Sequence, residues 1–398
     1  MLHLRRLKRP VHIVSLLLVL ACAREKTAMK VPLAVPAIDT LAGGIVRVVN
    51  HGPTEWADTT GWKFVRELRF TPPDEGPGSL GQPSSIAVGA AGEIVVFDAK
   101  PAAIVVYSAR GEFLRSIGRQ GAGPGEYSAL VTLRMHHDTL IVQDRFAHRL
   151  VFFALDGRVL GGAPALGGPI MQLTPEGILS FLNYLTSAPS LADDDIGEGV
   201  IRMRTDGTVV DTLPFPAAPR PQLWTLLDAT HDLGCPIPFT PERVSRLDHD
   251  GRLLWGDQGV YRVIVAPHGL DTARIIEAIA PRWPIADSLR TDAFAVAVRK
   301  APWIKSRGTL ADIPTSYPLW TTFFTDEQRD LWVSRPGPNR RVQFMDVFDS
   351  AGVLRGTVPV PFDDAQVRAV YRRNGRFYLA MENDQGLTSI EVWRIQKQ

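Results

Sequence analysis

The chain has 398 residues, a net charge of +2 at neutral pH, and lysines and arginines that are scattered beyond the first ten residues. Nucleic-acid-binding proteins usually concentrate basic residues in one patch, so this composition argues against a nucleic-acid partner. The 31 prolines and 34 glycines are typical of a chain with many turns.

Residues 1–21 have the organisation of a secretory signal peptide. Basic side chains at residues 5–9 precede an apolar run at residues 11–20, which is short for a bilayer span. The run ends in VLAC, which resembles a bacterial lipobox, and this resemblance implies a lipid on Cys22. We therefore expect an exported protein anchored to the cell envelope, in the bacterial outer membrane or periplasm.

The mature chain is expected to be a tether followed by one monomeric domain. Residues 22–42 contain few aromatic side chains and are predicted to be the tether, and residues 43–398 form the domain. Cleavage removes four positive charges from a net of +2, which leaves the mature chain at −2. With Cys22 lipidated, Cys235 is the only other cysteine, so stability must come from the core and not from a disulfide.

The stretch from residue 81 to residue 125 predicts the fold. It contains four short runs rich in Val, Ile and Phe, separated by turn residues, as expected for one antiparallel four-stranded sheet. The pattern recurs, because Asp98 and Asp144 are 46 residues apart, and so are Gly111 and Gly157. Four-stranded repeats of about 40 to 50 residues are typical of β-propeller blades. The alternative is a β-sandwich with regular turns.

A further copy places Asp257 in the matching position. The first copy, residues 83–118, resembles an NHL repeat, and residues 118–127, GRQGAGPGEY, resemble a signature of bacterial six-bladed β-propellers related to NHL-repeat proteins. The resemblance implies a fold and a connection between blades, and it implies no chemistry. Gly123 and Gly125 of the signature are expected to adopt φ values that other residues resist.

An all-β, six-bladed propeller accounts for the remaining chain. The blades are predicted at residues 84–117, 131–160, 171–213, 243–279, 320–360 and 366–395. The last blade has only three strands of its own, whereas residues 62–70 read as a strand without a blade. Pairing residues 62–70 with residues 389–394 would complete the sixth sheet, close the ring and cover an exposed edge.

Three segments do not follow the blade pattern. Residues 286–300 predict a short helix outside the ring between blades four and five, capped by Asp287 or Ser288. Residues 45–50 form a β-like run of unclear place, and residues 214–241 are irregular. The apolar side chains of the helix would share one face; they are Leu289, Ala293, Val296 and Ala297.

Candidate chemistry is sparse. The recurring Asp98, Asp144 and Asp257 could line a metal or substrate channel, but we favour turn caps that accept backbone hydrogen bonds. Several acidic residues could hold Ca²⁺ but lack the spacing of a calcium loop; they are Asp193, Asp194, Asp195 and Glu198. Three histidines are too few and too poorly spaced for zinc, and the first two would face opposite sides if they lie on a strand; they are His136, His137 and His148.

Two larger sets have both structural and functional interpretations. Five tryptophans could form a ligand floor but more often fill the space between blades; they are Trp224, Trp255, Trp303, Trp320 and Trp332. Five arginines could gather at one mouth of the channel and attract an anion; they are Arg262, Arg340, Arg341, Arg372 and Arg373. The sequence does not place these arginines at one end.

Two classes of function remain open. A rigid propeller with variable loops can act as a non-enzymatic binding module for a protein or glycan partner. A metal-dependent hydrolase or lyase, like the gluconolactonase/paraoxonase group, would need Glu, Asn, Asp or His side chains to converge on the axis. We favour the binding module, and we assign no catalytic residue, metal ligand or cofactor.

Overall fold

Six antiparallel groups of four strands contain most of the strands, five as separate sheets and one within a six-stranded sheet. In the computed structural model the first three are β4 (Pro83–Val88) to β7 (Phe113–Ile117), β10 (Val131–His136) to β13 (Val159–Pro164), and β14 (Ile170–Leu173) to β17 (Val209–Pro214). Their middle strands are β5 (Ile94–Ala99), β6 (Ala102–Tyr107), β11 (Thr139–Asp144), β12 (Arg149–Ala154), β15 (Ile178–Tyr184) and β16 (Glu198–Arg204).

The other three sheets begin with β20 (Arg243–Leu247), β24 (Thr322–Thr325) and β28 (Val367–Arg373). The sheet of β20 continues through β21 (Leu253–Asp257), β22 (Arg262–Ala266) and β23 (Arg274–Ala278). The sheet of β24 continues through β25 (Leu331–Pro336), β26 (Gln343–Phe348) and β27 (Leu354–Val360). The sheet of β28 continues through β29 (Arg376–Glu382), β30 (Thr388–Lys397) and β3 (Trp62–Phe70). Two short strands, β8 (Arg119–Gln120) and β9 (Glu126–Tyr127), pair separately.

The structure describes residues 34–51 and 62–397, except residues 129–130, 167, 185–197, 217, 219–220, 228–231, 249, 267–270, 340–341 and 364–365. All described residues belong to one unit, Leu33–Gln398. The signal peptide, Cys22, Asp193, Asp194 and Asp195 lie outside the described residues.

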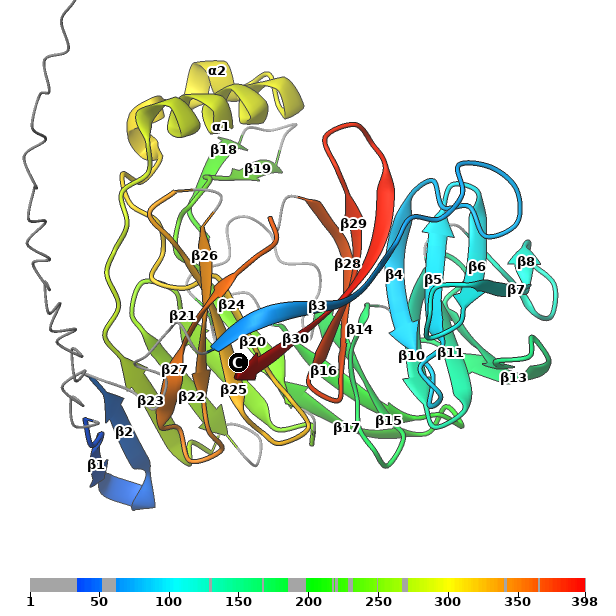
Figure 1. Ribbon diagram of the computed structural model, residues 1–398. Coiled ribbons are helices and arrows are strands. Elements are labelled where there is room, and N and C mark those ends of the chain that lie inside the picture. The colour runs from blue at the N-terminus through cyan, green and yellow to red at the C-terminus, as the bar shows by residue number, and fades with distance from the viewer. Residues whose placement is uncertain are drawn as a thin grey trace, which may run out of the picture. The chain divides into compact units, whose positions relative to one another are not determined.

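The first strand of each sheet lies next to the first strand of the following sheet. Contacts run from β28 to β4, then to β10, β14, β20 and β24, so these first strands surround a common axis (Figure 1). The chain is a six-bladed β-propeller, and the blade boundaries agree with those predicted from the repeat to within a few residues.

Apolar side chains hold neighbouring blades together. Among the described residues, one buried cluster lies at each of the six interfaces between blades. The cluster between blades six and one contains Ile390 and Ile86, both nearly inaccessible to solvent. Trp320 and Trp332 fill such interfaces, and Trp255 packs against another, as expected of large side chains between stacked sheets.

The ring closes through the two ends of the propeller domain. Strand β3 pairs antiparallel with β30, from Trp62 opposite Lys397 to Phe70 opposite Ile390. Figure 1 shows the two strands side by side. The predicted closure is confirmed: an N-terminal strand supplies the fourth strand of the last blade and covers the edge of β30.

The segment before β3 extends blade four. Strand β2 (Val46–Asn50) pairs in parallel with β23, and β1 (Ala37–Thr40) pairs with β2 after a 3₁₀ turn, Ala42–Gly44. The Asn50 amide donates to the Glu277 and Gly352 carbonyls, which ties β2 to blades four and five. Strand β1 lies within residues 22–42, the segment predicted to be the tether, and forms the edge of the blade-four sheet.

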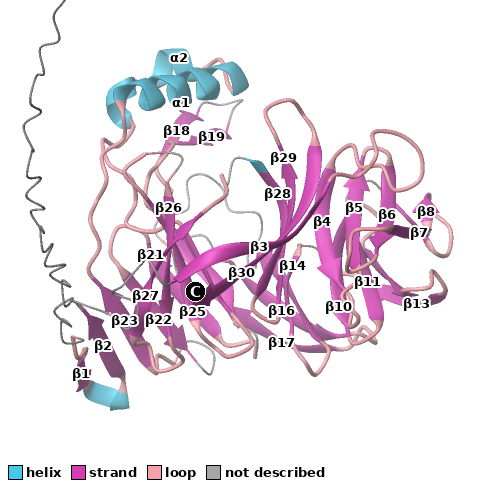
Figure 2. Ribbon diagram, viewed as in Figure 1, coloured by secondary structure: helices cyan, strands magenta, loops and turns pink. Residues whose placement is uncertain are grey.

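An insertion between blades four and five lies at one end of the ring (Figure 2). It comprises α1 (Asp287–Lys300), α2 (Ile304–Arg307) and a 3₁₀ turn, Leu310–Asp312, so the predicted helix is confirmed and the insertion is longer than expected. The α1 N-cap is Ala286, and neither Asp287 nor Ser288 caps the helix. No helix in the described part of the chain is long and apolar enough to cross a membrane.

Residues 214–241 are not irregular. They contain a hairpin, β18 (Leu223–Leu227) and β19 (Asp232–Pro236), which packs against the insertion helices. The Trp224 indole is buried, contacts the Phe294 ring edge-to-face and donates to the Asp312 carboxylate. Trp224 and Trp303 therefore belong to the core of the insertion and not to an interface between blades.

Candidate anion site on the propeller axis

The carboxylate of Asp98 binds the chain that enters the innermost strand of its blade. Asp98 is buried at the end of β5 and accepts hydrogen bonds from the backbone N–H groups of Gly81, Gln82 and Lys100, at 2.6, 2.5 and 3.2 Å. An ionised carboxylate that accepts several N–H bonds is a strong local tie. Asp98 thus fixes where β4 begins.

Asp144 occupies the same position in blade two and makes the same kind of contacts. Its carboxylate accepts from the Ser128 N–H and hydroxyl and from the Ala147 N–H. Burial opposes ionisation, but these hydrogen bonds and the nearby Arg149 outweigh it, so the pKa of Asp144 is lowered. Asp257 differs, because it pairs with the Arg243 guanidinium at 2.8 and 3.0 Å.

The predicted turn glycines are of two kinds. Gly111, Gly157 and Gly125 have φ values of 86°, 97° and 73°, which side chains other than glycine rarely adopt. Gly123 does not have a positive φ; its N–H donates to the Glu126 carboxylate at 2.7 Å. That hydrogen bond, and then the ion pair with Arg119, lower the pKa of Glu126.

His136 and His137 do not both lie on a strand, so the condition for their facing opposite sides is not met. His136 ends β10, whereas His137 lies in the following turn with a φ of 51°, and their ring centroids are 4.4 Å apart. Burial, and then His137, lower the pKa of His136. Within the residues that can be described, no three His, Cys, Asp or Glu side chains are grouped as a metal site.

The predicted arginine set does not converge at one mouth. Arg262 lies on the third strand of blade four and pairs with Glu277, so it is remote from the axis. Arg373 donates to the Val88 carbonyl, and the Arg372 guanidinium lies 3.4 Å from the centroid of the Phe324 ring. Arg340 and Arg341 lie outside the described residues.

Strand pairing identifies which side chains are equivalent on the inner strands. Arg134 lies opposite Ile141, three residues before Asp144, and Arg246 lies opposite Leu254, three residues before Asp257. The two arginines therefore occupy the same level of β10 and β20, in blades two and four. The same level holds Gln172 in blade three and Phe324 in blade five.

The Arg134 guanidinium binds backbone carbonyls. It donates to Leu133 of its own strand at 2.9 Å and to Ile170 of β14 at 2.7 Å. It forms no ion pair with a described carboxylate, and burial lowers the pKa of Arg134. A desolvated charge without a counter-ion is costly, and in the described structure only backbone carbonyls offset that cost for Arg134.

Arg246 also binds a backbone carbonyl and no described carboxylate. Its guanidinium donates to the Ser245 carbonyl at 2.9 Å and pairs with no carboxylate among the described side chains. Its side chain is accessible to solvent, yet desolvation lowers the pKa of Arg246.

Tyr371 lies near Arg134. It is on β28 and packs against the clusters on both sides of blade one, which places its ring next to β4 near the axis. Burial raises the pKa of Tyr371, and Arg373 and Arg134 partly oppose this effect. The Tyr371 phenol is therefore a neutral hydrogen-bond donor close to Arg134.

Arg335 is a buried arginine that pairs with a carboxylate, and it serves as a comparison for Arg134 and Arg246. Arg335 donates to both carboxylate oxygens of Asp346, at 2.5 and 3.0 Å, and Asp346 also accepts from the Tyr261 phenol. Burial opposes the charge on Arg335, but Asp346 outweighs it and the pKa of Arg335 is raised. The opposite shifts of Arg134 and Arg246 follow from the lack of such a partner among the described residues.

Comparisons with known proteins support the fold. A family model described as a 6-bladed beta-propeller matches residues 78–162. Among solved structures, a Bacteroides vulgatus protein of a family without assigned function has a TM-score of 0.50 and 11% identity, with 85% of this chain and 100% of that chain covered. No curated protein matches the chain.

Two further structures are similar at lower scores. A Bacteroides fragilis protein described as exported has a TM-score of 0.47 and 12% identity, over 89% of this chain and 99% of that chain. Virginiamycin B lyase from Staphylococcus aureus has a TM-score of 0.40 and 11% identity, over 84% and 99%. The family model and the match with a TM-score of 0.50 support the propeller fold, and none of the comparisons assigns an activity.

Proposed function

We propose that the protein is an exported, lipid-anchored propeller that acts as a non-enzymatic binding module for an anionic group of a protein or glycan. The observation that carries this proposal is the pair of unpaired, desolvated arginines, Arg134 and Arg246, at one level of the inner strands. Perturbed ionisable groups cluster at functional sites. A carboxylate, sulfate or phosphate would supply the missing counter-charge.

The level that carries the arginines is poorly suited to a catalytic metal. A hydrolase or lyase with an axial metal needs carboxylates, imidazoles or amides from several inner strands. The two arginines share their level with Gln172 and Phe324, and two positive charges at this level would repel a divalent cation. The charge of this level therefore favours the binding module over the metal enzyme.

Thermal unfolding of the mature protein in rising sulfate tests the proposal. We expect sulfate to raise Tm, since a ligand that binds only the folded state stabilises it. Arg134→Gln and Arg246→Gln should each weaken the sulfate response by about tenfold in concentration. Arg262→Gln, which removes a paired arginine, should leave the response unchanged. Equal responses from all four proteins would refute an axial anion site.

Capture from an envelope extract tests the biological role. The wild-type protein, immobilised through its N-terminus, should retain a partner that the Arg134→Gln/Arg246→Gln double variant does not retain. Sulfate should elute that partner with its mass unchanged, as expected for binding without chemistry. A partner that is retained equally by both proteins would place the binding surface elsewhere.

Anchoring through Cys22 is a separate part of the proposal. The basic segment, the short apolar run and the Ala21-Cys22 junction support it. Cells fed a labelled fatty acid should label the wild-type protein and not Cys22→Ser, which should accumulate as precursor or be released. Mass measurement of an unmodified mature N-terminus beyond Cys22 would contradict lipid anchoring.

A further inference from the structure

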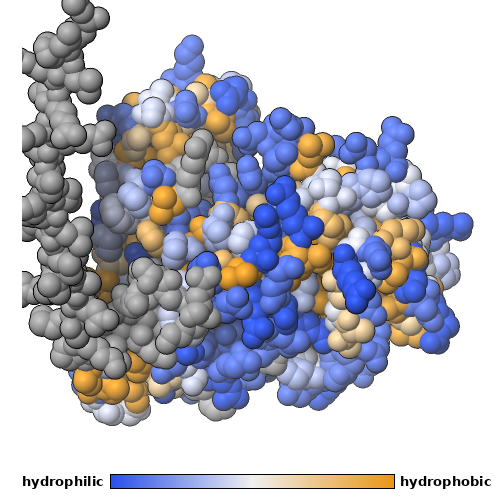
Figure 3. Space-filling view, viewed as in Figure 1, coloured by the Kyte–Doolittle hydropathy of each residue, from blue (hydrophilic) through white to orange (hydrophobic). Residues whose placement is uncertain are grey.

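A polar pocket lies where the ring closes. Its volume is about 580 Å³, and it opens between the face of the β3–β30 pair, residues 361–363 and 366, and the loop at residues 383–387. Figure 3 shows hydrophilic side chains gathered over β3 in the middle of this face. One wall comes from the N-terminal strand and the other from the C-terminal blade, so the pocket exists only in the closed ring.

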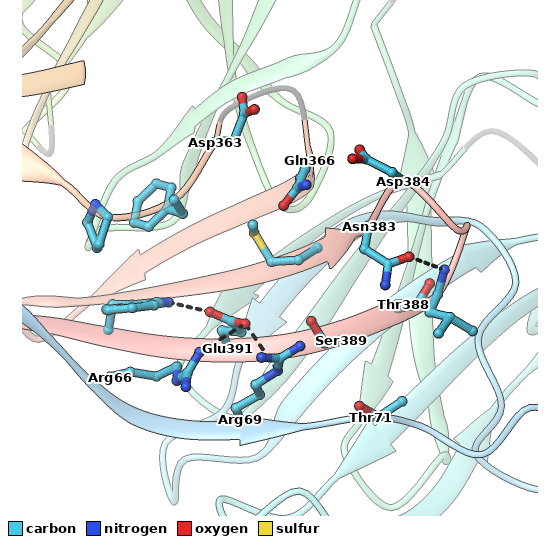
Figure 4. A pocket seen from close by; sticks show the side chains of 15 residues that line it. Arg66, Arg69, Thr71, Asp363, Gln366, Asn383, Asp384, Thr388, Ser389 and Glu391 are labelled. Atoms are coloured by element: carbon cyan, nitrogen blue, oxygen red, sulfur yellow. Dashed lines mark hydrogen bonds and ion pairs between the residues drawn. The ribbon is translucent and has the colours of Figure 1, made fainter. Parts of the chain in front are cut away.

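A β-bulge places two arginines on the same wall. Residues 66 and 69 of a regular strand would face opposite sides, but the register shifts between Arg66 and Leu68. The extra residue brings the Arg66 and Arg69 side chains to the same side as Glu391 (Figure 4). Bulges commonly re-aim side chains in this way.

The two arginines retain their hydrogen-bonding capacity. The nearest approaches to Glu391 Oε1 are 3.6 Å from Arg66 and 3.4 Å from Arg69, which is long for a hydrogen bond. Glu391 is 6% exposed, and its other oxygen accepts from the Trp393 indole at 2.8 Å. The Arg66 guanidinium lies over the Trp393 ring. Glu391 thus positions two guanidinium groups and neutralises only one of their charges.

The opposite wall offers neutral and acidic hydrogen-bonding groups. Asn383 Oδ1 accepts from the Gln385 and Leu387 N–H groups, whereas Asn383 Nδ2 donates to no described group. The loop side of the pocket is lined by Asp363, Gln366, Asn383 and Asp384 (Figure 4). Donors and acceptors alternating around one polar pocket suit a ligand with several hydroxyl groups.

We propose that this seam pocket binds a hydroxylated carboxylate of the size of a sugar acid. The ligand carboxylate pairs with Arg66 and Arg69, on the wall opposite Asp363 and Asp384. Its hydroxyl groups face Gln366, Asn383 and Asp384. The seam pocket shares no residue with the axial arginines. The proposal of a sugar-acid site here can therefore be tested separately from the proposal of an anion site at Arg134 and Arg246.

Calorimetric titration of the full mature protein with glucuronate tests the seam pocket. Glucuronate should bind at a ratio of one to one. Glucose and acetate should bind at least about tenfold more weakly, because glucose lacks the carboxylate and acetate lacks the hydroxyl groups. The methyl glycoside of glucuronate distinguishes a free sugar acid from a chain-linked residue: undiminished binding indicates a glycan, and lost binding a free acid.

Variants localise the binding. Arg69→Gln should weaken glucuronate binding at least about tenfold. Asn383→Asp should weaken it with an unchanged Tm, since the carboxylate still accepts from the turn while the amide donor is lost. Arg376→Gln, on the other side of the same sheet, should leave it unchanged. Absence of glucuronate binding, or equal binding of glucose, would overturn the proposal.

Discussion

Asp98 shows how much one buried carboxylate can hold in place. It is 1% exposed and accepts three backbone hydrogen bonds at the entrance to β4. Asp98→Ala leaves those donors without a partner, so we expect a loss of about 3 kcal/mol in the free energy of unfolding. Asp206→Ala, at an exposed turn, is the matched control and should change stability little. Urea unfolding measures both.

Asp144 should make stability depend on acid pH. Its pKa is lowered in the folded protein, so its stabilisation is fully present above the unfolded pKa of about 3.9 and is lost as pH falls through the folded value. At pH 7 the wild type should exceed Asp144→Asn by about 2 kcal/mol. The difference should shrink below pH 4. A difference that is constant from pH 7 to pH 3 would contradict this assignment.

The axial arginines could have been found from the sequence only through strand register. The recurring Asp98, Asp144 and Asp257 mark the end of the second strand in blades one, two and four, and pairing then identifies Arg134 and Arg246 as equivalent. The number of residues in each turn sets that register, and composition does not reveal it. The arginines chosen from the sequence were adjacent pairs or isolated residues, and adjacent residues on a strand face opposite sides.

Strand β3 is the element on which ring closure depends. It contributes Phe64 to the cluster between blades five and six, and Leu68 packs against the cluster between blades six and one. Deleting residues 63–70 should therefore lower the unfolding temperature by well over 10 °C and expose the edge of β30 to aggregation.

Deleting residues 23–40 is the matched control for β3. All four residues of β1 are exposed, and this deletion keeps β2 and its contacts with blade four. Its effect on the unfolding temperature should be within a few degrees. Size-exclusion chromatography and calorimetry compare the two truncated proteins. Equal stability of the two would mean that the ring does not depend on its N-terminal strand.

Other elements escaped prediction for local reasons. The β18–β19 hairpin carries no repeat signature, and its stability comes from Trp224 packing against helices that follow it by about 70 residues. The addition of β1 and β2 to blade four depends on an edge left open by β23. The bulge at Arg66 changes which side chains share a face without altering the composition of the strand.

At the scale of the whole molecule, repetition made the fold predictable. Six similar sheets must close on themselves to bury their faces, and six clusters occupy the interfaces of the described ring. Function was not predictable in the same way, because the propeller supports many activities and the binding groups differ from blade to blade. The differences between blades, such as Arg134 against Phe324, carry the functional information.

Anomalous diffraction from crystals soaked in selenate tests the axial anion site most directly. Selenate matches sulfate in charge and shape, and its selenium can be located at the absorption edge. The account predicts selenium density within hydrogen-bond distance of Arg134 or Arg246, with occupancy lost in the double variant. Selenium found only beside surface arginines such as Arg262, with none at the level of Arg134 and Arg246, would contradict it.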